Sequence, residues 1–236
     1  ARAAGPRRAT PVTVFLGGES EGWRDLDAWP PPTAEHILHP HPDGRLSDQP
    51  APQGAAAEFT YDPENPTPTI GGAFVTQLSP GFTAGYSDDS ALAARADTLA
   101  FTSDPLTATL EATGSPVVEL SHGSDNPFAD LFVRLSEVDA DGHSHNVSDG
   151  FVRLDPQRPS GTVRLDLDPI AHRFARGSRI RLLVAGGSHP RWERNLGTGD
   201  DPATSSATRP SQRAIDLANT RVVIPVEDTS TAETAH

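Results

Sequence analysis

The sequence has 236 residues and contains no Cys, no Lys and no Met. The missing Cys excludes disulfide bonds, cysteine nucleophiles and thiolate metal sites, but it leaves the cellular compartment open. The missing Lys, beside many Ala, Arg, Gly and Pro residues, indicates the codon bias of a GC-rich genome rather than a function. Because an initiator Met is missing as well, we expect the chain to be a processed product or a fragment of a longer protein.

Long apolar runs and an excess of positive charge are also absent. No run reaches the ~20 apolar residues that a membrane helix needs, and no signal peptide is visible, so we expect no membrane association. The formal net charge of −13 repels phosphate groups, so nucleic acid is not an expected partner. The low hydrophobic fraction of 35%, together with 23 Pro and 20 Gly, favours short strands joined by turn-rich connections.

Segments of strand type dominate the second half of the chain. From residue 97 to 226, apolar runs recur roughly every 10–15 residues and helical periodicity is nearly absent. A helical turn is expected only at 89–96. The expected strands are 12–16, 36–39, 59–61, 98–102, 107–112, 116–121, 131–135, 147–154, 162–168, 180–184, 214–217 and 222–226. This spacing predicts an all-β fold, an antiparallel β-sandwich of the jelly-roll type.

The stretch Gly18-Glu19-Ser20-Glu21-Gly22 fits the G-x-S-x-G pattern of a serine nucleophile elbow. The elbow requires a strand, a strained turn and then a helix that carries the serine at its N-terminus. Here Pro30-Pro31-Pro32 ends any helix after a short distance, and no apolar stripe supports a helix. We therefore interpret Ser20 as an ordinary loop residue rather than a nucleophile.

A histidine cluster with H-x-x-H-x-H spacing is formed by His36, His39 and His41. Zinc sites usually combine such spacing with rigid strands or helices and a further ligand, whereas this cluster alternates with Pro40 and Pro42. We interpret these His residues as solvated loop residues, with metal binding as the alternative.

The stretch Asp139-Ala140-Asp141-Gly142 is a hairpin-turn signal, and His143 and His145 follow it. Its acidic residues resemble the start of a calcium loop, but the EF-hand pattern needs Glu at the twelfth position, which here is Gly150. We expect a plain turn and no metal ion. A calcium site assembled from loop carboxylates stays open as an alternative.

Ser188 and His189 place a hydroxyl beside an imidazole after the expected strand at 180–184. Adjacent residues of a strand point to opposite faces, so these two cannot form a nucleophile–base pair on one. We interpret them as part of a loop in which Trp192 and its Arg neighbours pack locally.

Motifs along nearly the whole chain resemble one known family. The most specific is the Y-D-P-x-x-P-x-P-T-x-G-G stretch at 61–72, and the next is F-x-x-G-x-R-I-R at 174–181. The other stretches are 22–24, 29–30, 101–106, 110–114, 138–142, 149–153, 189–191 and Asn195. In this order and spacing the chain resembles the C-terminal domain of the CocE/NonD hydrolases, which include cocaine esterase, α-amino acid ester hydrolases and X-prolyl dipeptidyl aminopeptidases.

The resemblance implies a Ser-His-Asp hydrolase divided over domains, with the triad in an α/β-hydrolase domain that precedes residue 1. The chain itself is then an accessory jelly roll, similar to galactose-binding domains, with no catalytic residue and no cofactor. Residues 1–32 are expected to be a remnant of the hydrolase domain with the crossover, 33–226 the jelly roll, and 227–236 a disordered tail. The upstream hydrolase domain is the expected partner, and homo-oligomerisation stays open.

In this family, the segment after the double glycine approaches the active site and helps to wall the acyl pocket. The matching positions are Gly71, Gly72, Ala73 and Phe74, which we therefore expect to line a substrate pocket. For Phe74, a place in the core of the sandwich is the alternative. For the whole chain, the alternative function is a carbohydrate-binding module, because lectin domains share the jelly roll. Ester or X-Pro peptide specificity stays open.

Overall fold

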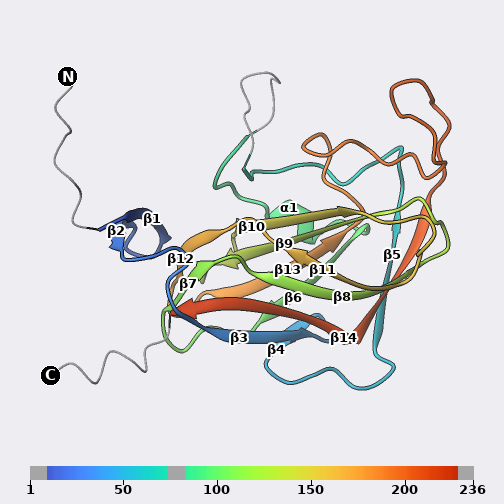
Figure 1. Ribbon diagram of the computed structural model, residues 1–236. Coiled ribbons are helices and arrows are strands. Elements are labelled where there is room, and N and C mark those ends of the chain that lie inside the picture. Colours follow the sequence, from blue (N-terminus) through green and yellow to red (C-terminus); the bar gives the residue numbers. More distant parts are fainter. Residues whose placement is uncertain (1–9, 74–82, 228–236) are drawn as a thin grey trace, which may run out of the picture.

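The computed structural model describes residues 10–73 and 83–227, and their strands form two packed layers (Figure 1). In hydrogen-bonded order, the first layer consists of β10 (Ser144–Arg153), β9 (Asp130–Val138), β13 (Arg179–Ala185), β6 (Thr98–Ser103) and β4 (Arg45–Ser47). The short helix α1 (Ser90–Ala93) precedes β6 and matches the helical turn expected at 89–96.

The second layer is built around the long strand β14 (Ser211–Glu227). One edge of β14 pairs with β3 (Thr33–Pro40) and β5 (Ala56–Tyr61), and the other pairs with β7 (Leu110–Gly114) and β8 (Val117–Ser124). Beyond these lie β11 (Gly161–Asp166), paired with β8, and β12 (Ile170–Phe174), paired with β7. The hairpin of β1 (Val12–Gly18) and β2 (Gly22–Leu26) attaches to β12 at one end of the molecule (Figure 1).

The two layers are joined at a corner by β3. Its residues 33–38 pair with β14, whereas His39 and Pro40 pair with β4 of the other layer. The all-β prediction is therefore confirmed, and most strand pairs are antiparallel as expected. Two pairs, β1–β12 and β4–β6, are parallel, which the sequence did not predict. The jelly-roll connectivity stays a prediction.

The hydrophobic core lies between the layers and follows from the alternation of side chains along the strands. Leu131, Val133 and Leu135 of β9 point into it, opposite Ile215 and Leu217 of β14, and all five are fully buried. Each fully buried aliphatic side chain of this size contributes about 1.5–3 kcal/mol. Burial of this core thus stabilises a sandwich that has no disulfide bonds.

Strand β9 is buried on its second face as well, although its alternation predicts a polar, half-exposed face. Phe132, Arg134 and Ser136 point away from the core, but loops cover them and their exposure falls to 0–1%. This covered face supports the candidate site described below. The one helix in the described part of the chain has four residues, so none there is long and apolar enough to cross a membrane.

Candidate functional site

The predicted pocket-wall residues lie between β5 and α1, where two segments of the chain run side by side and are joined by backbone hydrogen bonds. Gly72 and Gly85 exchange two backbone hydrogen bonds of 2.9 Å. The Gly71 N–H donates to the Thr83 carbonyl, also at 2.9 Å. We call the paired residues 71–72 and 83–85 the glycine neck.

The double glycine is required by the path of the backbone over buried polar groups. The φ angles are +64° at Gly71 and +103° at Gly72, a region that other residues avoid. A Cβ on Gly71 would lie 2.5 Å from Asn146 Oδ1, and a Cβ on Gly72 would lie 2.6 Å from Asp149 Oδ2. Any side chain at these positions would push the neck off the surface beneath it.

A cavity of about 260 Å³ opens beside the glycine neck. Gly72, Ala73 and Tyr86 border it on one side, and Val147 of β10 and Ile170 of β12 border it on the other. Two of the predicted wall residues therefore line a cavity, and Gly71 is their immediate neighbour. Phe74, the fourth, lies outside the described residues, and the identity of this cavity as a substrate pocket stays a prediction.

Tyr86 is the most exposed aromatic side chain beside this cavity, at 60%. Its ring stacks on His145, with centroids 4.8 Å apart and an interplanar angle of 8°. Burial of the hydroxyl group, and then the negative charge of Glu137, raise the pKa of Tyr86 to about 12. The phenol is therefore protonated at neutral pH and is a hydrogen-bond donor at the edge of the cavity.

The imidazole of His172 lies on the cavity wall and pairs with Glu137 behind it, with 2.8 Å between Nε2 and Oε2. Burial acts to raise the pKa of Glu137. Hydrogen bonds from His172 and from the Ala175 N–H outweigh this effect, so the net pKa lies below its ordinary value. The ionised carboxylate ties β9 to β12 across the sandwich, which is a structural role.

The G-x-S-x-G stretch forms the turn between β1 and β2. A strand follows it, not a helix, so the geometry of a nucleophile elbow is absent from this part of the described chain. Ser20 is exposed and has a φ of +56°. Its interpretation as a loop residue is confirmed.

The β1–β2 hairpin carries apolar side chains on both faces. Phe15 and Trp23 are cross-strand partners on one face, with ring centroids 5.4 Å apart, and they are 47% and 75% exposed. On the opposite face Leu16 is buried, but Val12 and Val14 are only half-buried. The hairpin thus exposes one pair of large aromatic side chains, Phe15 and Trp23.

Ion pairs hold the hairpin against the sandwich. Arg24 of β2 pairs with Glu111 of β7, and its Nη2 lies 2.5 Å from Glu227 Oε1 of β14. Arg173 donates to the same Glu111 at 2.8 Å. We call these residues the Arg24 cluster. β1 also joins β12 through a parallel register of two residue pairs. The turn after β1 adds hydrogen bonds between Glu19 and both Arg173 and Thr109.

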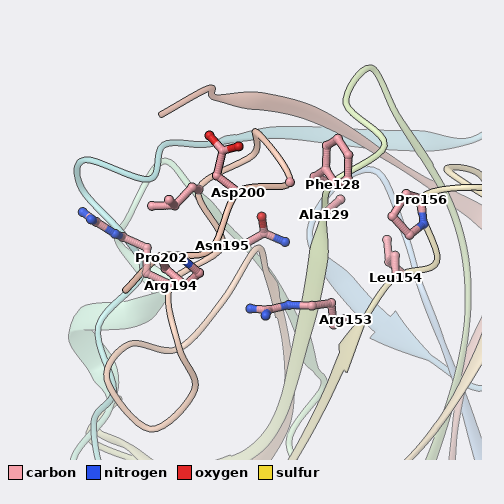
Figure 2. A pocket seen from close by; sticks show the side chains of 11 residues that line it. Phe128, Ala129, Arg153, Leu154, Pro156, Arg194, Asn195, Asp200 and Pro202 are labelled. Atoms are coloured by element: carbon pink, nitrogen blue, oxygen red, sulfur yellow. The ribbon is translucent and has the colours of Figure 1, made fainter. Parts of the chain in front are cut away.

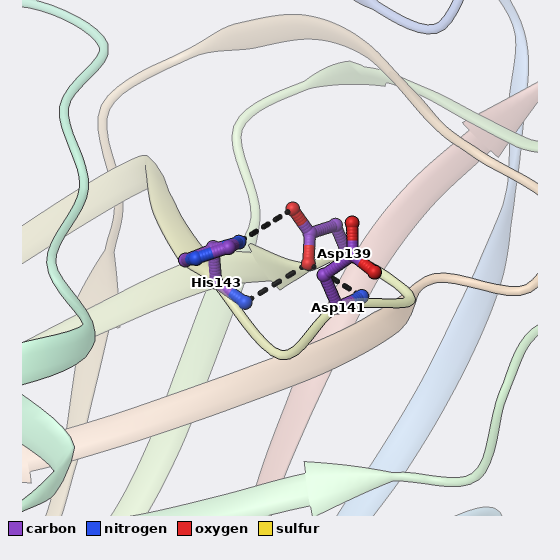
Figure 3. A group of neighbouring side chains, drawn as sticks. All are labelled: Asp139, Asp141 and His143. Atoms are coloured by element: carbon purple, nitrogen blue, oxygen red, sulfur yellow. Dashed lines mark hydrogen bonds and ion pairs between the residues drawn. The ribbon is translucent and has the colours of Figure 1, made fainter.

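The turn between β9 and β10 brings Asp139, Asp141 and His143 together (Figure 3). One ligand atom from each lies within 4.8 Å of the others. The Asp139 carboxylate accepts hydrogen bonds of 2.9 Å from the N–H groups of Asp141 and His143. The expected plain turn is confirmed and explains this cluster. That it binds no metal stays a prediction.

The remaining catalytic or metal-ligating candidates have structural partners. The interpretation of His36, His39 and His41 as solvated loop residues is wrong: His36 and His39 lie on β3, and His41 is buried and bonds to Ser47 and to the Gln49 carbonyl. Among the described residues these three His form no group of metal-ligand atoms. Ser188 lies beyond the end of β13 and bonds to Thr69 at 3.0 Å. The loop interpretation of this stretch is confirmed.

A second cavity of about 170 Å³ lies where β9 begins and β10 ends (Figure 2). Phe128, Leu154 and Pro156 form one side of it, and Figure 2 shows Asn195 between them and Pro202. Its charged groups are engaged elsewhere in the chain: Arg153 pairs with Asp130 at 3.1 Å, and Arg194 donates to the Pro63 carbonyl. Asp200, the third charged group on the lining, accepts a hydrogen bond of 3.1 Å from the Ser205 hydroxyl.

Comparison with known proteins agrees with these features. The family described as the X-Pro dipeptidyl-peptidase C-terminal non-catalytic domain matches residues 5–224. The chain belongs to this family. The resemblance to the C-terminal domain of CocE/NonD hydrolases is thereby confirmed.

Individual relatives of this X-Pro dipeptidyl-peptidase C-terminal domain are longer than the chain. It is 28% identical over 209 residues to the cocaine esterase of Rhodococcus sp. (strain MB1 Bresler), a match that covers 80% of the chain but 36% of that protein. An aminopeptidase from a marine sediment archaeon, Thaumarchaeota archaeon, superposes with a TM-score of 0.80 at 23% identity, covering 95% and 42% of the two chains.

An α-amino acid ester hydrolase superposes with a TM-score of 0.78 at 21% identity, and 42% of its chain is covered. Both solved structures share the fold of this domain. The chain thus spans between about a third and about two fifths of the length of the proteins it matches. The activities of those longer proteins are therefore not assigned to this domain.

Three residues of the site were missed by the sequence analysis. Arg134 lies within the expected strand at 131–135 and Arg191 within the expected loop, but neither they nor Tyr86 were named as site residues. The double glycine at 71–72 could have indicated this site, because two successive Gly residues favour a backbone that packs closely against other groups.

Proposed function

We propose that the chain is the accessory domain of a serine hydrolase of the ester or X-Pro dipeptidyl-peptidase class. It packs on the α/β-hydrolase domain of the same polypeptide, and Gly71, Gly72, Ala73 and Phe74 help to wall the active site. Residues 1–32 then belong to the crossover from the hydrolase domain. Family membership and the partial coverage of longer relatives support this proposal.

The β1–β2 hairpin is the observation that carries the proposal. Two-stranded hairpins are marginal in water unless other structure covers them. Here Leu16 is buried and Arg24 forms ion pairs with the sandwich, while Trp23 stays 75% exposed. Large aromatic side chains at an interface each bury about 150–250 Å², which makes Trp23 and Phe15 suitable anchors for a neighbouring domain.

The test mixes the purified chain with the hydrolase domain encoded upstream of it. Binding is measured by calorimetry, and turnover with chromogenic ester and X-Pro substrates. We expect a complex in which the hydrolase domain gains stability or turnover. Trp23→Ala should weaken binding at least about tenfold, which corresponds to ~1.4 kcal/mol. Arg164→Ala, on the exposed face of β11, is the control and should bind normally.

The same samples decide between this proposal and its alternatives. If the two domains neither bind nor affect each other's stability or turnover, the accessory role is wrong. Binding of the chain to a glycan panel, lost in Trp23→Ala, would favour the carbohydrate-binding alternative. Ester turnover by the chain alone, lost in Ser20→Ala, would favour a self-contained hydrolase.

A further inference from the structure

The glycine neck rests on a buried network of charged side chains that the proposed function does not yet use. Arg134 of β9 is 0% exposed, and its guanidinium forms a two-pronged pair with Asp149 of β10, at 2.6 Å from Nε and 3.0 Å from Nη2. Its Nη1 donates to the Ile70 carbonyl at 2.6 Å. Arg134 thus binds Ile70, which precedes the glycine neck, and also Asp149, which lies beside Gly72.

Arg191 closes the network from the loop after β13. Its Nη1 donates to Asp149 Oδ2 at 2.5 Å and its Nη2 to Asp168 Oδ2 at 2.8 Å. Its backbone N–H donates to Thr69 Oγ1 at 3.1 Å. The Arg191 side chain lies over the ring of Trp192, 4.2 Å from its centroid. One carboxylate, Asp149, therefore receives hydrogen bonds from two Arg residues on different elements.

Gly72 sits directly on this junction. A Cβ there would lie 2.6 Å from Asp149 Oδ2 and 2.8 Å from Arg191 Nη1. The backbone at Gly72 therefore passes close to the network, and we expect a change in the geometry of Arg191 or Asp149 to move Gly72. Gly72 in turn carries Gly85 with it, because their backbones exchange two hydrogen bonds.

Stability alone does not explain charges at this place. Well-packed apolar side chains often stabilise a buried site as well as an ion network does, because desolvation offsets the attraction between the charges. A planar guanidinium that bonds two carboxylates adds fixed direction, which apolar contacts lack. The face of β9 beneath the neck is thus suited to fix position, not merely to fill volume.

We propose that Arg134, Asp149 and Arg191 are positioning residues that fix the glycine neck, and with it the cavity wall at Gly72 and Ala73. This inference rests on the proposed function for its catalytic consequence, but not for its structural one. The network sets where the wall stands beside Val147 and Ile170, so it sets the shape of the cavity that the hydrolase domain would complete.

The structural part is tested on the chain itself by amide hydrogen exchange. In Arg191→Met we expect exchange at Gly71, Gly72 and Gly85 to accelerate at least about tenfold, while amides of β9 stay protected. Arg191→Lys can reach one carboxylate at a time and should give an intermediate rate. Arg164→Met, which removes an exposed Arg that pairs with Glu119 and Asp166, is the matched control.

The catalytic part is tested in the longer hydrolase that contains this chain. Arg191→Met should raise KM about tenfold with kcat changed less than about twofold, and Arg191→Lys should recover part of that loss. Unchanged exchange at the neck in Arg191→Met overturns the positioning network, whatever the kinetics. Faster exchange with unchanged KM supports the network and instead overturns the pocket-wall function.

Discussion

The molecule contains two ion networks that hold a projecting segment, and they differ in burial. The Arg134 network beneath the glycine neck has side-chain exposures of 0% for Arg134, 2% for Asp149 and 11% for Arg191. In the Arg24 cluster beneath the β1–β2 hairpin, Glu111 is 12% exposed, but Arg173, Arg24 and Glu227 are 27%, 36% and 40% exposed. Enclosed charges interact strongly and tolerate no loss of a partner, whereas solvent-shared charges are screened.

This difference separates a fixed segment from an adjustable one. The glycine neck packs on the buried side chains of the Arg134 network, which we propose fix its position, and it borders the cavity at Gly72 and Ala73. The hairpin is held by partners shared with water and by a short parallel register, so its aromatic face can adjust to a neighbouring domain. The following predictions would break or sharpen this comparison.

The largest effect is expected for Arg134→Met. The substitution leaves Asp149 and Asp89 buried without the Arg134 charge, and breaking a buried pair costs about 3–5 kcal/mol of unfolding free energy. Urea denaturation monitored by tryptophan fluorescence measures it, with Arg164→Met as control. A loss below about 1 kcal/mol would mean that the network is solvated in solution and resembles the Arg24 cluster.

Gly72→Ala should have the next largest effect. The new Cβ would meet Asp149 and Arg191, and φ is +103°, so we expect a loss of about 1–3 kcal/mol. Gly142→Ala is the matched control, because Gly142 has a φ of +93° but no atom within 4 Å of its Cβ position. Equal losses in the two variants would show that backbone strain alone, and not contact with the network, explains the double glycine.

The third prediction concerns His122, a buried imidazole that forms no ion pair with a carboxylate of the described residues, and the dependence of unfolding free energy on pH. Burial, and then the charge of Arg213, lower the pKa of His122 below 6.5. As pH falls below 6.5, the unfolded state binds the proton first, so stability decreases, by at most about 1.4 kcal/mol per pH unit for one group. Thermal unfolding from pH 5 to 7 should show this slope. Burial lowers the pKa of His36 and His39 as well, so His122→Asn should reduce the slope without removing it, and an unchanged slope would contradict the assignment to His122.

The smallest effect is expected for Arg24→Met. Arg24 is 36% and its partner Glu227 40% exposed, and Glu111 keeps Arg173 as a second partner, so the loss of unfolding free energy should be below about 1 kcal/mol. Urea denaturation next to Arg134→Met gives the direct comparison. A loss as large as that of Arg134→Met would show that the hairpin is part of the rigid fold and would remove the distinction between the two segments.

The sequence was most informative where a local pattern decides the structure. The alternation at 131–135 and the apolar run at 180–184 predicted β9 and β13, because side chains that alternate with a period of two need only a neighbouring layer to be buried. The Asp139 turn was predictable for a similar reason, since its hydrogen bonds lie within five residues.

Features that depend on distant partners were not predictable from one sequence. The residues of β2, Gly22–Leu26, precede a proline triplet and read as a loop, yet pairing with β1 makes them a strand. His172 and Arg173 weaken the strand signal of β12, but Glu137 and Glu111 from other strands accommodate them. Arg134 is buried because segments distant in sequence reach it, the Ile70 carbonyl from the loop before the neck and Asp89 from the segment before α1.

The outer edge of β2 has a practical consequence for handling the protein. β2 is the last strand in the hydrogen-bonded order, so within the described residues its second row of backbone N–H and C=O groups has no strand beside it. Open strand edges recruit other chains, and natural proteins protect them with charges or cover. Here an exposed Trp lies on that same strand. Samples of the isolated domain should therefore self-associate as concentration rises, and a fusion that covers this edge should keep them monodisperse.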